Sequence, residues 1–188
     1  TPPASYRVLT DIAQTTLSMA TRAAYQAVCE RLGKPKGRYA LVAMGKFGGQ
    51  ELTYGSDLDL IFLIEFLEDQ EFFVRLGQRI ISLMGVITQD GYAYKVDMEL
   101  RPSGRSGVLV SSLPSFQEYH EKMAMLWEHQ ALIKARPVIG EENFQKIAAQ
   151  LIHRIVYRQR PASIGSEIKR LRLRMEQELA HERPGQFD

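Results

Sequence analysis

Cysteine and tryptophan are nearly absent from this chain of 188 residues, which has one of each. The single cysteine, Cys29, excludes an intrachain disulfide and is typical of a reducing, cytoplasmic compartment. No uninterrupted apolar run is long enough to cross a bilayer and no signal peptide is evident, so we expect no membrane partner. The 24 basic and 22 acidic residues nearly balance, which gives no reason to expect a nucleic-acid partner.

One stretch, residues 45–62, combines a glycine-rich turn with paired carboxylates. It reads Gly-Lys-Phe-Gly-Gly-Gln-Glu-Leu-Thr-Tyr-Gly-Ser-Asp-Leu-Asp-Leu-Ile-Phe. Side chains alternate along a strand, so Asp57 and Asp59 share one face, where their charges repel unless a cation such as Mg²⁺ lies between them. Gly48 and Gly49 would let the backbone N–H groups approach a phosphate. The alternative interpretation is a polar hairpin end without a ligand.

The order of these features resembles the nucleotidyltransferase superfamily, whose members share a polymerase β-like fold. The fuller string, from Gly-Lys-Phe-Gly-Gly-Gln-Glu-Leu to Ser-Asp-Leu-Asp-Leu-Ile-Phe, is similar to the glutamine synthetase adenylyltransferase family. The similarity covers about residues 40–140 and includes Arg-Pro-Ser-Gly and Trp-Glu-His-Gln-Ala-Leu. The resemblance implies that Asp57 and Asp59 bind Mg²⁺ together with the triphosphate of ATP.

The superfamily usually completes its metal site with a third carboxylate from a neighbouring strand, and Asp97 is our candidate. Alternation over residues 95–101 puts Asp97, Glu99 and Arg101 on one face. The family motif usually has arginine where this chain has Glu99. This glutamate either supports the metal-binding carboxylates or weakens the binding of the nucleotide. A solvent-facing ladder of salt bridges is the alternative interpretation.

Three further side chains are candidates for phosphate binding. Ser56 either bonds a phosphate oxygen or caps the turn. Lys46 either neutralises the triphosphate or is an exposed turn lysine. Arg101 is the stronger candidate because a guanidinium binds phosphate through two hydrogen bonds, and its alternative is a salt bridge to a nearby acid.

The hydrophobic pattern predicts an α+β fold, with a nucleotidyltransferase core followed by the start of a helical bundle. We expect the core over residues 1–140 and the helical region over 141–188, in a chain excised from a longer protein. Pro137 and Gly140 indicate a break between helices. The predicted helices cover residues 6–32, 68–88, 114–122, 125–135, 141–157 and 163–181, and the predicted strands cover 38–44, 58–66, 92–100 and 108–111.

The resemblance implies Mg²⁺-dependent transfer of AMP from ATP to a tyrosine hydroxyl of glutamine synthetase. The same scaffold also supports the opposite reaction, phosphorolytic removal of AMP, and a non-catalytic nucleotide-binding module is a third hypothesis. Arg-Pro-Ser-Gly and Trp-Glu-His-Gln-Ala-Leu look more like the domain that attaches AMP. The family further implies glutamine and a PII-type signalling protein as regulators of the full-length enzyme.

Overall fold

The computed structural model describes residues 4–89, 91–104 and 107–158, with residues 165, 169, 170, 172, 173 and 176. The chain forms two compact units, Thr1–Val156 and Tyr157–Asp188. The helices and strands discussed below all belong to the first unit. The helix predicted over residues 163–181 lies outside the described residues, apart from these isolated positions.

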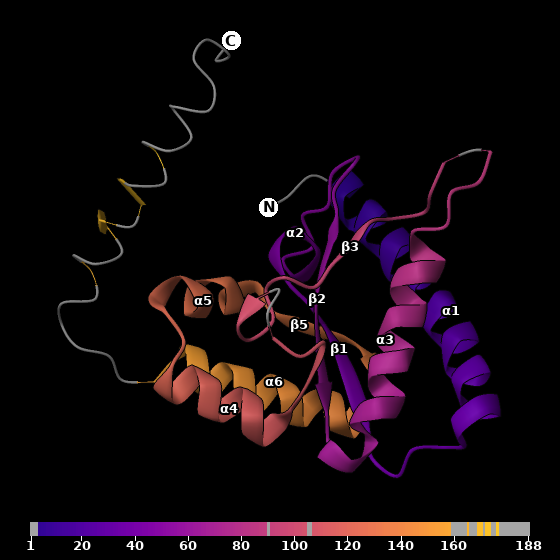
Figure 1. Ribbon diagram of the computed structural model, residues 1–188. Helices are drawn as coiled ribbons and strands as arrows, with labels where there is room; N and C mark the ends of the chain where they lie inside the picture. Colours follow the sequence, from indigo (N-terminus) through magenta and orange to yellow (C-terminus); the bar gives the residue numbers. More distant parts are fainter. Residues whose placement is uncertain are drawn as a thin grey trace. The chain divides into compact units, whose positions relative to one another are not determined.

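A mixed β-sheet forms the centre of the first unit (Figure 1). Its strands are β1 (Tyr39–Ala43), β2 (Leu58–Ile64), β3 (Val96–Asp97), β4 (Val110–Ser112) and β5 (Arg136–Gly140). The order is β3-β2-β1-β5, and β4 also pairs with β2. Strand β1 runs antiparallel to β2 and β5, whereas β3 and β4 run parallel to β2. Because β1 occupies one edge of β2, β3 and β4 follow one another along its other edge.

Helices cover both faces of the sheet (Figure 1). They are α1 (Ala4–Leu32), α3 (Gln70–Met84), α4 (Leu113–Lys122) and α6 (Glu142–Val156). Phe62 points into a core shared with α1 and α3, and its neighbour Leu63 points into a second core shared with α4 and α6. Strand β2 is therefore hydrophobic on both faces beyond Asp59, as expected for a central strand covered on two sides.

The α+β prediction is confirmed, and α1, β1 and β2 lie where the pattern placed them. The helix predicted over 68–88 ends at Met84, since Gly85 follows as its C-cap. Ile87, which falls inside the predicted range but beyond the end of the helix, is 82% exposed. The compact unit also extends to Val156, because α6 packs on β1 and β5, so the predicted boundary at residue 140 falls inside it.

Two strand predictions differ from the structure. The strand expected over 92–100 is reduced to β3, and the chain turns after Asp97. Met98 packs in the core with α1 and α3, while Leu100 packs in the other core, so the predicted alternation ends there. Strand β5 was not predicted, because Pro137 indicated only a break. As an edge strand, β5 tolerates a proline, and its register against β1 shifts beside this residue.

Candidate active site

A loop over residues 44–57, which begins with a sharp turn at Gly45, joins β1 to β2, and its first residue is tied to the start of β2. The Met44 N–H donates a hydrogen bond of 2.9 Å to the Asp59 carbonyl. Gly45 follows with φ 51°, and a Cβ there would collide with the Asp59 carboxylate. The chain then forms the short helix α2 (Gly45–Gly48). The sequence pattern drew attention to the later pair, Gly48 and Gly49, and the role of Gly45 in this turn was not predicted. Its position directly after the hydrophobic run could have indicated it.

The parallel pairing of β2 with β3 brings two of the predicted carboxylates together. Asp59 and Asp97 are register partners, and Leu58 pairs with Val96 beside them. Asp57 comes directly before β2, on the side from which the strand begins. Three acidic residues from two segments about forty residues apart in sequence therefore have backbone positions at the same end of the sheet, next to the turn after β1.

The carboxylates influence one another electrostatically. Burial raises the pKa of Asp59, and the negative charges of Asp97 and Asp57 raise it further. The charges of Lys46 and Lys95 oppose this shift. The direction of the shift means that the folded chain disfavours the ionised form of Asp59 in the absence of an additional cation.

Lys95 was not recognised from the sequence as part of this site. Its Nζ atom lies 2.9 Å from Asp57 Oδ2, and this hydrogen bond raises the pKa of the lysine. Asp97 has a different partner, because its Oδ1 accepts a 2.7 Å hydrogen bond from the Glu99 N–H. The Lys95 side chain is exposed, so its ion pair with Asp57 is open to exchange with another cation.

The donor set suits Mg²⁺, which prefers carboxylate oxygens. Asp59 and Asp97 offer such oxygens on adjacent strands, and their mutual repulsion favours a cation. Within the described part of the chain, no group of three or more acidic, histidine or cysteine side chains is gathered closely enough to hold a metal ion. Asp57 is paired with Lys95 instead, so a three-carboxylate site requires Asp57 to leave that lysine.

The glycine pair has a packing role in this structure. The Gly48 N–H donates to the Met44 carbonyl at 2.8 Å, and the Gly49 N–H donates to the Gly45 carbonyl at 3.1 Å. A Cβ on Gly48 would collide with the backbone carbonyl of Lys134. The two N–H groups are therefore engaged within the turn, and their contact with phosphate stays a prediction.

Arg136, on the unpredicted strand β5, fastens the turn to the rest of the fold. Its guanidinium donates to the carbonyls of Phe47 and Gly48, each at 3.3 Å, and to Gln14 Oε1 on α1 at 3.0 Å. Burial lowers the pKa of Arg136, and the charge of Asp11 opposes that effect. One arginine thus ties the end of α2 to both a neighbouring strand and a helix.

The three remaining candidates have distinct surroundings. Ser56 caps its own turn, since its Oγ accepts from the Thr53 N–H at 3.2 Å. The Arg101 guanidinium donates to the carbonyls of Met98 at 2.7 Å and Gly107 at 3.2 Å. Lys46 is exposed on α2. Their roles toward phosphate remain predictions.

The covered mixed sheet, with carboxylates at one end of β2, is an α+β fold of the nucleotidyltransferase type. The sequence profile of the family described as glutamate-ammonia ligase adenylyltransferase matches residues 4–151, and the chain belongs to this family.

Several curated relatives share the name bifunctional glutamine synthetase adenylyltransferase/adenylyl-removing enzyme. The one from Hahella chejuensis is 39% identical over 194 residues, covering 91% of this chain and 20% of the relative. That from Thioalkalivibrio sulfidiphilus is 39% identical over 203 residues, covering 96% and 21%. That from Acinetobacter baylyi is 38% identical over 194 residues, covering 91% and 21%. The chain thus spans about a fifth of the length of these relatives.

The described residues contain no helix that combines the length and the apolar character needed to cross a bilayer.

Proposed function

We propose that this chain transfers AMP from ATP to a tyrosine hydroxyl of glutamine synthetase in a magnesium-dependent reaction. The observation that carries the proposal is the register pairing of Asp59 with Asp97, beside Asp57, in a member of an adenylyltransferase family. Glutamine synthetase comes from the name of the curated relatives.

Asp57, Asp59 and Asp97 would hold the magnesium. When bound, the ion supplies positive charge that stabilises the triphosphate and the departing pyrophosphate. The tyrosine oxygen forms a bond to the α-phosphorus, and the bond from that phosphorus to the bridging oxygen breaks. The phenolic proton passes to a carboxylate, for which Asp97 is the candidate because it stands on a separate strand, opposite Asp59.

Lys46 and Arg101 are the candidate cations for the triphosphate. Lys46 is exposed and acts electrostatically on Asp59, so it meets the phosphates without rearrangement of the backbone. Arg101 first has to release the Met98 and Gly107 carbonyls. We therefore propose that Lys46 contacts the triphosphate first and that Arg101 does so afterwards.

The opposite reaction, in which phosphate attacks the AMP–tyrosine linkage and ADP leaves, is the second candidate. The curated relatives are named for both activities, and the chain covers only about a fifth of each. The same carboxylates serve either direction. The Arg-Pro-Ser-Gly and Trp-Glu-His-Gln-Ala-Leu strings favour the attaching reaction.

The test incubates this chain with Mg²⁺, unmodified glutamine synthetase and ATP labelled in its α-phosphate. We expect label on a synthetase tyrosine, and at least about a 100-fold lower rate for Asp97→Asn. Glu30→Gln, which removes an exposed carboxylate on α1, is the control and retains the rate. Release of ADP from AMP-modified synthetase and phosphate, without any labelling, would assign the chain to the removing reaction.

The finer properties of the full-length enzyme are part of the same proposal. We place it in the cytoplasm, with glutamine and a PII-type signalling protein as its regulators. Binding of either regulator to this chain alone is measurable by calorimetry.

A further inference from the structure

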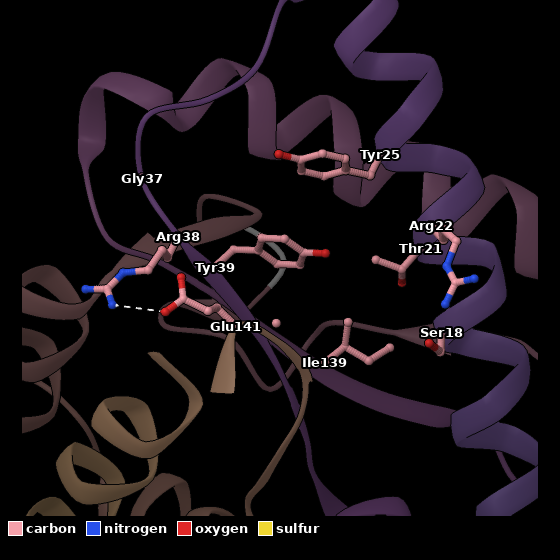
Figure 2. A pocket seen from close by; sticks show the side chains of 10 residues that line it. Ser18, Thr21, Arg22, Tyr25, Gly37, Arg38, Tyr39, Ile139 and Glu141 are labelled. Carbon is pink, nitrogen blue, oxygen red and sulfur yellow. Dashed lines mark hydrogen bonds and ion pairs between the residues drawn. The ribbon is translucent and has the colours of Figure 1, made fainter. Parts of the chain in front are cut away.

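A cavity of about 420 Å³ lies between α1, the start of β1 and the end of β5 (Figure 2). Its wall includes Thr21 and Arg22 from α1, Tyr39 from β1 and Ile139 from β5. Tyr39 begins β1, whereas the carboxylates lie beyond the other end of that strand, roughly 17 Å away by the rise of a β-strand. The cavity is therefore separate from the candidate active site, and its volume is typical of a small-molecule pocket.

Thr21 supplies a buried polar group without a partner. Its side chain is 2% exposed, and its Oγ1 has no hydrogen-bond partner among the described residues. The other threonines of α1 behave differently. Thr10, Thr15 and Thr16 each donate to the carbonyl four residues earlier, at 2.7 to 2.9 Å. Leaving a buried hydroxyl unpaired costs free energy, and a ligand or water in the cavity could satisfy it once rotation of the Thr21 side chain turns the buried Oγ1 toward the cavity.

Arg22 and Tyr39 add donors to the same wall. In Figure 2 the Arg22 guanidinium extends beside Ser18, and the Tyr39 hydroxyl is directed toward the α1 side of the cavity. Neither side chain makes a hydrogen bond or ion pair with another described residue. Burial, with a contribution from Tyr25, raises the pKa of Tyr39 to about 12, so its hydroxyl keeps its proton and can donate.

We propose that this cavity is a second ligand site, and that it binds a small organic molecule through a carboxylate group. The carboxylate pairs with the planar guanidinium of Arg22, which matches its geometry. The Tyr39 hydroxyl donates to it, and the Thr21 hydroxyl donates to it or to a neighbouring oxygen after the threonine side chain has rotated.

The surroundings favour a singly charged organic ligand over an inorganic dianion. The rings of Tyr25 and Tyr39 are nearly parallel, with centroids 6.1 Å apart, and give the cavity an aromatic side that suits a carbon skeleton. The other cation on the wall, Arg38, is already paired with Glu65 at 2.7 Å and with Glu141 at 3.5 Å. Glu141 also lines the cavity, so a dianion there would meet an opposing negative charge.

The test titrates butyrate, acetate and inorganic phosphate separately into the full chain and follows the backbone amide signals by NMR. Butyrate carries one negative charge and a short carbon chain, so we expect saturable shifts with it at residues 18–25 and around Tyr39. Arg22→Gln should weaken butyrate binding about tenfold, because a hydrogen bond to a charged group is lost. Thr21→Val, which keeps the side-chain shape, should weaken it about fivefold.

Two matched variants on α1 are the controls. Arg7→Gln removes an exposed arginine, and Thr16→Val removes an exposed threonine hydroxyl, both outside the cavity wall. Both should bind butyrate as the unmodified chain does. Absence of saturable shifts with butyrate and acetate, or binding of phosphate alone, would overturn the proposal. Equal weakening by Thr16→Val and Thr21→Val would do the same.

Discussion

Asp59 and Asp97 face one another in register on the adjacent parallel strands β2 and β3. Each strand presents its carboxylate where the sheet ends, next to the turn after β1. Burial and the two neighbouring carboxylates raise the pKa of Asp59, so the apo chain carries an electrostatic cost at this position. That cost makes the site measurable through stability as well as through activity.

Asp59→Asn should stabilise the metal-free chain at neutral pH. Folding raises the pKa of Asp59, so protonation of this side chain stabilises the folded state. This contribution is fully present below the unfolded-state pKa of about 3.9 and is lost as the pH rises through the folded-state pKa. The amide mimics the protonated form at every pH. Urea unfolding in a chelator should show the variant more stable at pH 7, with the difference shrinking toward pH 4. A difference that grows as pH falls would contradict this, and Glu30→Gln, at an exposed carboxylate on α1, is the control.

Magnesium should stabilise the unmodified chain and have little effect on Asp59→Asn. A ligand at 100 times its Kd stabilises the folded state by about 2.7 kcal/mol. Thermal unfolding over a series of Mg²⁺ concentrations measures the effect. Equal increases in Tm for the two proteins would show that the ion binds elsewhere.

Lys95→Gln should increase the affinity for Mg²⁺ severalfold. Lys95 lies 2.9 Å from Asp57 and competes with a metal ion for that carboxylate. Calorimetric titration of the metal alone, without nucleotide, separates this effect from any contact of the lysine with phosphate. Lys34→Gln, in the exposed loop after α1, is the control. Unchanged or weaker metal binding by Lys95→Gln would show that the ion does not use Asp57.

Gly48→Ala should lower the free energy of unfolding by about 1–3 kcal/mol, because the new Cβ would overlap backbone carbonyls that cannot move independently. Gly49→Ala is the matched comparison. There the nearest atom, at 2.9 Å, is Cδ of the Lys134 side chain, which can shift, so we expect a smaller loss. Urea unfolding of the two variants tests the ranking, and a reversed ranking would contradict the packing role of Gly48.

Arg136→Gln should destabilise the fold by about 1.5–3 kcal/mol, since buried acceptors lose a charged donor. Arg136→Lys should recover only part of this loss, because one ammonium cannot span two carbonyls on α2 and Gln14 on α1. Hydrogen exchange of the turn amides should increase in both variants. Arg7→Gln, an exposed arginine on α1, is the control. Unchanged exchange would show that the turn holds without this arginine.

The sequence by itself determined the α+β class, the strand–turn–strand unit and the candidate carboxylates. Local patterns carry this information: Leu58 and Leu60, which alternate with the aspartates, are buried, and helical spacing located α1 and α6. The family resemblance depended on the same stretch of residues. These features follow from residues close together in the chain, where periodicity and turn chemistry act directly.

Only the tertiary structure decided what surrounds the carboxylates. The pairing of Lys95 with Asp57 depends on how β3 meets β2. The anchoring of α2 depends on Arg136, which lies in a strand that was not predicted because Pro137 indicated a break. The alternation predicted beyond Asp97 ended because Met98 and Leu100 pack in different cores. Such contacts join segments about 40 to 120 residues apart, and local propensity carries no information on them because their free energy is gained only when the whole sheet assembles.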